Sequence, residues 1–289
     1  MKIKNIIEQV MKSFFFICGM MTIIAMLTIA IYLIINGVPA IREVGLFNFL
    51  FGQIWAPVHS TEPQFGILPF ILTSIYGTFG AVLIGVPIGL MTAIFLSKLS
   101  NPKISVVVNT AVELLAGIPS VVYGFIGLSV LVPLVRETFG LLSGATLFSA
   151  IIVLSIMILP NIINVSRVAL AAVPTKYEEA SYALGATKME TIFKVSMPAA
   201  RSGIAAGVVL GIGRAIGEAM AVMMVAGNVA NMPELFRGVR FLTTAIASEL
   251  SYAAAGIHRN ALFSIALVLF VFIIIINIVL NLLLKRGVK

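Results

Sequence analysis

The stretch VPTKYEEASYALGATKMETIFKVSMPAARSG, residues 173–203, decides how the rest of the chain is interpreted. It is polar and lies between two apolar runs. Two pairs have capping-box spacing, a Thr three residues before a Glu: Thr175 with Glu178, and Thr187 with Glu190. Gly185 suits the left-handed end of the first helix, and Pro198 is expected to end the second. The pattern predicts two short helices joined by a glycine turn.

On both sides of this loop the composition is that of a polytopic membrane protein. Of the 289 residues, 60% are hydrophobic and only 10% are charged, against about 25% in soluble domains. All 11 acidic residues are Glu, the two His are far apart, and Cys18 is the one cysteine. We therefore expect no intrachain disulfide, no metal site and no catalytic residue.

Six apolar runs are each long enough to cross a hydrocarbon core of about 30 Å as a helix. They are residues 13–36, 68–97, 104–131, 144–165, 202–227 and 260–284. The predicted fold class is all-α, a membrane-embedded bundle of six transmembrane helices. Pro87 and Pro119 predict tilt or kinking, and Gly117 with Pro119 is a candidate helix break that exposes backbone groups at a cavity. The first run is too long for a signal peptide and is interpreted as a retained span.

The basic residues set the orientation. Most of those outside the spans fall on the side of the N-terminus, so both termini are predicted to be cytoplasmic in a bacterial or archaeal cell (inner) membrane. The net charge of +8 is thus a topology signal and not a nucleic-acid surface. We divide the chain into an N-terminal helix with an outer segment, 1–67, a core of five spans, 68–284, and a basic tail, 285–289. The core contains the cytoplasmic loop at about 173–201.

Two outer segments carry further signals. The first, about 37–67, holds four aromatic residues that favour an interfacial segment with aromatic anchors over a ligand contact: Trp55, Phe47, Phe49 and Phe51. The second, 229–259, is a candidate part of a docking surface, on account of Glu234, Glu249 and His258.

The fifth run contains GRAIGEAM, residues 213–220, with two full charges. On a helical wheel, Arg214 and Glu218 share a face about 80° wide with glycines at four-residue spacing, so this face points to protein or a cavity. An intramembrane Arg costs several kcal/mol, and its planar guanidinium suits a tetrahedral oxyanion. Glu218 would neutralise Arg214 between transport events or accept a proton. The alternative is an internal ion pair that only orients the helix.

The loop resembles the EAA loop of ABC importer permeases, whose pattern is E-A-A-x3-G-x9-I-x-L-P. Glu179-Ala180-Ser181, Gly185 and 195–198 (VSMP) keep its spacing, with mild departures at Ser181, Val195 and Met197. The resemblance implies the type I, MetI-like permease fold and a loop that docks on a cytoplasmic ATPase. The implied coupling residues are Glu178, Glu179, Ala180, Ser181 and Gly185. The chain has no G-x-x-x-x-G-K-[ST], so ATP and Mg²⁺ are expected on the partner and no cofactor on this chain.

Residues 112–128 (VELLAGIPSVVYGFIGL) and 210–228 (LGIGRAIGEAMAVMMVAGN) resemble PstC-type permeases of phosphate importers. The resemblance implies ATP-driven import of inorganic phosphate, with Arg214 on the substrate path and Glu218 beside it. Where that family more often has GETMAV, Ala219 replaces the Thr. The implied partners are a second, similar permease chain, two cytoplasmic ATP-binding subunits, an extracytoplasmic phosphate-binding protein and the lipid bilayer. No nucleic acid is expected.

Glu113 lies near the cytoplasmic edge of the third run and is interpreted as a buried gating or ion-pair residue, since a carboxylate repels phosphate. Other hypotheses stay open. Sulfate, molybdate or phosphonate would suit an intramembrane Arg about as well. A proton-coupled carrier using Glu218 is disfavoured by the EAA loop and by the lack of a complete inverted repeat. A membrane-embedded enzyme has little support without Asp, a His pair or a metal-ligand cluster.

Overall fold

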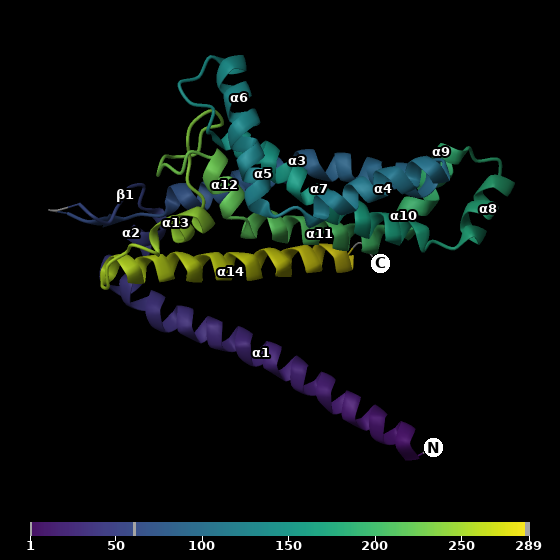
Figure 1. The fold of residues 1–289 in the computed structure, drawn as a ribbon, viewed down its shortest axis with the longest axis horizontal. Helices are drawn as coiled ribbons and strands as arrows, with labels where there is room; N and C mark the ends of the chain where they lie inside the picture. Colours follow the sequence, from purple (N-terminus) through teal and green to yellow (C-terminus); the bar gives the residue numbers. More distant parts are fainter. Residues whose placement is uncertain (1, 60–61, 287–289) are drawn as a thin grey trace.

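The computed structural model describes residues 2–59 and 62–286, a bundle of long helices with short elements at its two ends (Figure 1). The long helices are α1 (Lys2–Val44), α3 (Leu68–Ile94), α4 (Pro102–Gly117), α7 (Leu147–Ala171), α11 (Arg201–Gly217) and α14 (Ile257–Arg286). Helices α1 and α14 meet at one end and diverge toward the other, so the first half of α1 stands away from the bundle (Figure 1). Most of the predicted basic tail, residues 287–289, lies outside the described residues.

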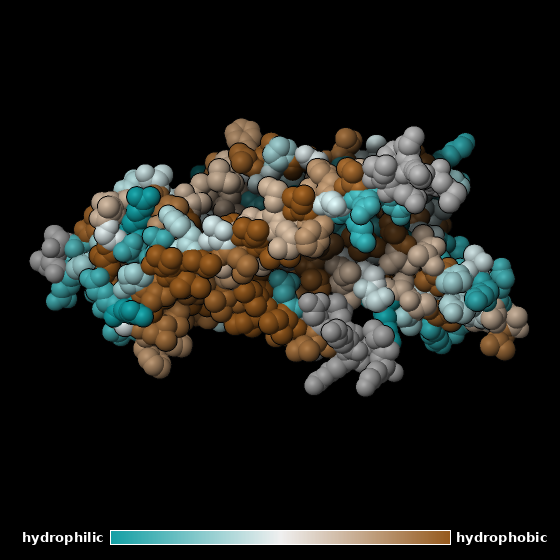
Figure 2. Space-filling model, turned by 90° about the horizontal axis from the view of Figure 1, so that it is seen from below, coloured by the Kyte–Doolittle hydropathy of each residue, from teal (hydrophilic) through white to brown (hydrophobic). Residues whose placement is uncertain are grey.

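The predicted all-α membrane bundle is confirmed, with shifted boundaries. Five helices in the described part of the chain are long and apolar enough to cross a membrane: Glu8–Val44, Leu68–Leu99, Ser120–Phe139, Leu147–Ala171 and Ile257–Leu280. A sixth is added if Lys188–Ala199 and Arg201–Gly217, bent by 73°, count as one span. On the face shown in Figure 2, hydrophobic residues cover the middle of the molecule and hydrophilic residues gather toward the ends.

The third predicted span, 104–131, is not one continuous helix, and the expected break at Gly117 and Pro119 is confirmed. Helix α4 ends at Gly117, and the chain resumes as α5 (Ser120–Ile126), a π-helical turn η2 (Gly127–Leu131) and α6 (Val132–Phe139). Ile118 is extended, with φ −69° and ψ 128°. Pro119 causes this break, because its ring excludes the preceding residue from the helical region and it has no N–H to donate. The segment that can cross a membrane therefore begins at Ser120.

The fifth predicted span, 202–227, is also interrupted. Helix α11 ends at Gly217, Glu218 is extended with φ −74° and ψ 130°, and α12 (Met220–Val225) follows. Gly213 and Gly217 have low helix propensity, which weakens the last turn of α11. The helical wheel, which assumes a continuous helix, placed Arg214 and Glu218 on one face. That prediction is wrong, because the helix ends between them.

The core lies along α7, which packs between α3 and α11. Its central apolar side chains are fully buried: Leu154, Met157, Ile158 and Ile162. The predicted glycine face of α11 is confirmed here, because a Cβ at Gly211 would lie 3.0 Å from Ile162 and one at Gly207 would lie 3.1 Å from Val165. The small residues thus let α11 approach α7 closely.

The loop of residues 173–203 forms one end of the molecule (Figure 1), with α8 (Thr175–Ala183), α9 (Lys188–Thr191), a π-helical turn η3 (Ile192–Ser196) and α10 (Met197–Ala199). Gly185 adopts the expected positive φ of 84°, and the Thr187–Glu190 capping box forms. The first predicted box is wrong: α8 has no side-chain cap, because Glu178 bonds elsewhere. Pro198 lies in the first turn of α10, and the chain turns at Ala200 rather than at the proline.

The opposite end contains α2 (Leu46–Phe51), a two-stranded antiparallel sheet of β1 (Trp55–Ala56) and β2 (Gln64–Phe65), and α13 (Leu242–Glu249). Phe47 and Phe51 are exposed, as expected of interfacial anchors. Phe49 and Trp55 are buried in an apolar cluster with residues of α3, α13 and α14. For these two side chains the anchor interpretation is wrong, because the sheet folds Trp55 back against Phe70.

Candidate functional site: two broken spans and the α8 loop

Arg214 lies in the last turn of α11, about 20 Å along the helix from Arg201 at 1.5 Å per residue. Its side chain is half-buried. Within the described residues it forms no ion pair and no hydrogen bond, although it lies within electrostatic range of Tyr123. A guanidinium in a membrane segment needs a counter-charge or a polar cavity, so Arg214 marks this region as a candidate anion site.

Glu218 occupies the break that follows Arg214. Its Oε1 accepts a hydrogen bond from the Ala221 N–H at 3.0 Å, which caps the start of α12. Its backbone carbonyl accepts a 2.7 Å hydrogen bond from Thr243 Oγ1, at the start of α13. The alternative interpretation, a helix-internal ion pair with Arg214, is therefore wrong, because the helix ends before Glu218 and the carboxylate is engaged by the next helix.

The break in the third span lies beside the break in the fifth. Helix α5 packs on α12, and Gly124 permits this contact, since a Cβ there would lie 2.8 Å from the Ala221 Cα. Tyr123 donates a 2.7 Å hydrogen bond across the first break to the Leu115 carbonyl. Irregular backbone at membrane depth is tolerated where it is buried in protein or lines a cavity. The two breaks and Arg214 thus form one polar region within the apolar bundle.

Glu113 does not belong to the buried interior of this chain. It lies on the exposed side of α4, where its Oε1 accepts a 2.6 Å hydrogen bond from Asn109 Nδ2. Helix α4 packs on α7 through its other face, at Val108 and Val112. The interpretation of Glu113 as a buried charge is wrong for this chain, and in the described residues it has no cationic partner.

The α8 loop divides the five predicted coupling residues into two groups. Glu179, Ala180 and Gly185 are exposed. Glu178 and Ser181 instead face the loop interior, where Ser181 Oγ lies 2.9 Å from Thr191 Oγ1.

Glu178 makes an ion pair and a hydrogen bond on the inner side of the loop. Its Oε1 lies 2.5 Å from Lys98 Nζ and accepts a 2.7 Å hydrogen bond from Ser196 Oγ. Partial burial acts to raise the pKa of Glu178, but the hydrogen bonds from Lys98 and Ser196 and the charges of Lys98 and Lys188 together lower it. The pKa of Glu190 is lowered to about 2, chiefly by the backbone N–H of Thr187 in the capping box. Both carboxylates therefore stay ionised at physiological pH.

The polar residues at the opposite end form a buried network rather than the docking surface we predicted from Glu249 and His258. Glu249 pairs with Arg240, accepts hydrogen bonds from Trp55 Nε1 at 3.2 and 3.1 Å, and lies 2.9 Å from His258 Nε2. Arg240 also donates to the carbonyl of Asn228. Glu234, by contrast, is exposed in a pair with Arg237. The side chains of Glu249 and His258 are withdrawn from the surface because α13 packs against β1 and α14.

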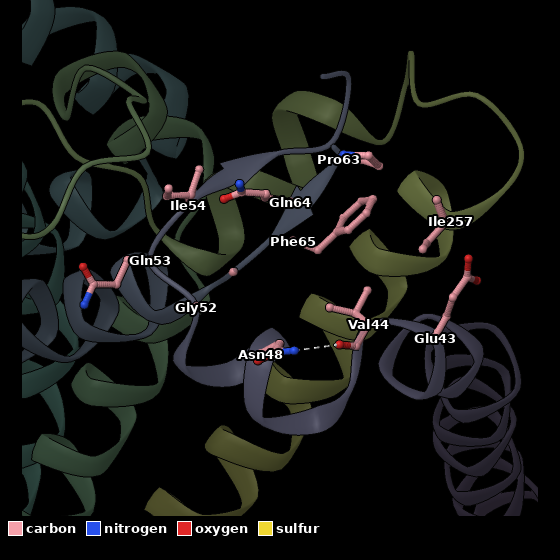
Figure 3. A pocket seen from close by; sticks show the side chains of 11 residues that line it. Glu43, Val44, Asn48, Gly52, Gln53, Ile54, Pro63, Gln64, Phe65 and Ile257 are labelled. Atoms are coloured by element: carbon pink, nitrogen blue, oxygen red, sulfur yellow. Dashed lines mark hydrogen bonds between the residues drawn. The ribbon is translucent and has the colours of Figure 1, made fainter. Parts of the chain in front are cut away.

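A pocket of about 570 Å³ also lies at this end, between α1, α2 and the sheet (Figure 3). Asn48 lies on its wall and donates a 3.4 Å hydrogen bond to the Val44 carbonyl. Among the described lining residues the charged one is Glu43, a carboxylate that repels anions. No residue of α5, α11 or α12 is among the described lining residues, so this pocket is distinct from the Arg214 region.

Comparison with known proteins identifies the family. Residues 85–288 match the family described as binding-protein-dependent transport system inner membrane component. The chain belongs to this family. It is a multi-pass inner membrane permease subunit of an ABC transporter, a transport component and not an enzyme.

Two curated relatives cover most of the permease. It is 41% identical over 268 residues to the "Probable ABC transporter permease protein YqgH" of Bacillus subtilis, covering 90% of this chain and 86% of the relative. It is 38% identical over 263 residues to the "Phosphate transport system permease protein PstC" of Pasteurella multocida, covering 84% of this chain and 81% of the relative. The expected resemblance to PstC-type permeases is therefore confirmed.

Solved structures give the fold. The permease resembles a chain of a bacterial alginate ABC transporter in complex with a pentasaccharide-bound periplasmic protein, with a TM-score of 0.62, 17% identity and coverage of 94% and 92%. It also resembles a chain of the inward-facing MetNI methionine ABC transporter, with a TM-score of 0.57, 22% identity and coverage of 78% and 95%. The MetI-like permease fold is confirmed.

Sequence reasoning missed four residues that shape the permease's polar regions: Lys98, Tyr123, Ser196 and Thr243. Tyr123 had a signal, a polar hydroxyl within an apolar run directly after a helix-breaking proline. The others had none, because each contacts a residue far away in the sequence.

Proposed function

We propose that the chain is the transmembrane permease subunit of an ATP-driven importer of inorganic phosphate. The observation that carries this proposal is Arg214, a half-buried guanidinium that no described carboxylate pairs with, beside two broken spans. A planar guanidinium can hold two oxygens of a tetrahedral oxyanion through parallel hydrogen bonds. The relative from Pasteurella multocida, named as a phosphate transport permease, supports phosphate as that oxyanion.

Glu218 is proposed to line the same path in a supporting role. Its carboxylate caps α12 and its carbonyl is bonded to Thr243, so it fixes the backbone at the break next to Arg214. A fixed break keeps the guanidinium at the edge of the path without a competing intrachain ion pair. Glu113, exposed on α4, is proposed to be a gating or ion-pair residue toward a partner chain.

The chain is proposed to work with four other components. A second, similar permease chain completes the path, two cytoplasmic subunits bind ATP and Mg²⁺, and an extracytoplasmic protein delivers phosphate. Both termini are cytoplasmic in this arrangement, because the lysine-rich α8 loop then faces the ATPase. Glu179, Ala180 and Gly185 present the exposed side of α8 and its following turn for docking.

The test is uptake of radiolabelled phosphate into vesicles that contain the assembled complex, with ATP inside. We expect uptake that requires ATP and the binding protein and that excess sulfate does not inhibit. The matched control is the same vesicle with a non-hydrolysable ATP analogue. ATP-dependent uptake of sulfate in place of phosphate would retain the permease class and overturn the phosphate assignment.

A further inference from the structure

The inward side of α8 is attached to the end of the second span. Lys98 Nζ and Ser196 Oγ both reach the same oxygen of Glu178, at 2.5 and 2.7 Å. The side chains of Lys98 and Glu178 are only 14% and 18% exposed. Solvent and salt screen such a pair far less than a surface pair, so the contact resists separation.

Both partners of Glu178 lie on π-helical turns. Lys98 belongs to η1 (Phe95–Leu99), which continues α3, and Ser196 belongs to η3, which leads through α10 into α11. Single π-turns within helices are frequent at functional positions. Glu178 therefore joins α8 to the ends of two membrane helices, one of them 80 residues earlier in the sequence.

Apolar packing fixes the helix ends that Glu178 reaches, although no residue of α8 itself is buried. Ile94 of α3, Leu170 of α7 and Ile192 of η3 form one buried cluster with Ala200 at the start of α11. Ser181 adds a second link from α8 to Thr191, which is itself fully buried. Helix α8 is therefore held by the Glu178 and Ser181 contacts, so it can move only with these packed helix ends or by breaking those contacts.

The outward side of the same helix has the opposite character. Tyr177, Glu179 and Tyr182 are exposed, and Leu184, which directly follows α8, is 90% exposed. One face of α8 thus contacts the helix bundle, and the other is exposed and free to contact a partner.

We propose that Glu178 is a positioning residue that couples α8 to the second span through Lys98, so that a displacement of α8 moves α3 with it. This inference rests on the proposed function, in which an ATPase displaces α8. It assigns Glu178 to the transmitting face of the loop and leaves docking to the exposed residues around Glu179.

The first test compares two single-lysine variants in the complete transporter. Lys98→Gln removes the buried pair, and Lys194→Gln removes the exposed pair with Glu190 in the same loop, where the side chains are 74% and 47% exposed. Each removes one positive charge from the same side of the membrane. We expect Lys98→Gln to retain ATP hydrolysis within about twofold while phosphate transported per ATP falls about tenfold, the effect of losing one charge-assisted hydrogen bond. Lys98→Arg should restore most of the ratio, and Lys194→Gln should leave it unchanged.

Equal transport per ATP in Lys98→Gln and wild type would overturn the proposal. If the wild-type complex hydrolyses ATP but carries no phosphate, the proposed function fails instead. A second measurement, which needs no substrate, then tests whether Glu178 couples α8 to α3.

The second measurement is the distance between spin labels at Leu99→Cys and Tyr182→Cys, two exposed positions, in a Cys18→Ser background. We expect the same narrow distance distribution in nucleotide-free and ATP-bound complexes, and a broad one when Lys98→Gln is added. A distance that changes on ATP binding with Lys98 intact would show that α8 and α3 move separately. If Lys98→Gln does not assemble, the labelled complex with Lys98 intact still decides the question.

Discussion

Replacing Glu249 with Ala removes the centre of the buried network at the sheet end of the molecule. The Arg240 guanidinium then loses its counter-ion, and the Trp55 N–H loses its acceptor. The two charged side chains are 15% and 6% exposed, so solvent cannot replace the lost partner. Breaking a buried ion pair by removing one member costs about 3–5 kcal/mol, because the remaining charge stays buried without compensation.

The matched control is Glu234→Ala. Its pair with Arg237 is exposed, with both side chains at 59%, and exposed pairs contribute about 0.2–1 kcal/mol. The assay is thermal unfolding of the chain in lipid nanodiscs, followed by the fluorescence of its one tryptophan, Trp55. Because Trp55 lies in the network, its emission reports the local loss of packing directly.

We expect Glu249→Ala to lower the unfolding midpoint severalfold more than Glu234→Ala and to shift the Trp55 emission to longer wavelength before any heating. Equal midpoints for the two variants, or an unchanged Trp55 spectrum, would refute this reasoning. Either result would mean that removing Glu249 does not leave Arg240 and Trp55 buried without a partner.

Two further predictions concern the site and the loop. Thr243→Val removes the donor to the Glu218 carbonyl and should reduce phosphate uptake about tenfold without loss of assembly. The control is Thr78→Val, because Thr78 has the same 8% exposure but its hydroxyl has no hydrogen-bond partner among the described residues. Thr78→Val should keep wild-type uptake. Equal uptake by the two variants would contradict the role of Thr243. The lowered pKa of Glu178 means that its pair with Lys98 is fully formed above the ordinary Glu pKa of about 4.3 and is lost only as pH falls through the lowered value. The distance between spin labels on α8 and α3 should therefore stay constant from pH 8 to 5, and broadening within that range would contradict it.

The features that the sequence predicts well are those with a local physical cause. Apolar runs long enough for a bilayer predict the bundle, and the Thr187–Glu190 box and Gly185 predict the second half of the loop. The glycine spacing of α11 correctly predicts its close approach to α7. Each of these depends on neighbours within one or two helical turns.

Features that depend on distant contacts were not predictable in the same way. A helical wheel assumes a continuous helix, so it placed Arg214 and Glu218 together although the chain breaks between α11 and α12. Glu249 looked like a surface charge because its partner Trp55 lies 194 residues earlier. Glu178 fitted a capping box by spacing, but a lysine from another span offered a stronger contact. In each case tertiary contacts overrode a valid local preference.

The most direct test of the central claim is phosphate uptake by the complete complex carrying Arg214→Gln, with ATP hydrolysis measured in the same vesicles. Gln keeps a polar side chain, shorter than that of Arg, but loses the charge and the two-pronged geometry. We expect assembly and basal ATP hydrolysis to persist and uptake to fall at least about tenfold, as the loss of one charge-assisted hydrogen bond implies. Uptake at the wild-type rate in a normally assembled complex would contradict the assignment of Arg214 to the phosphate path.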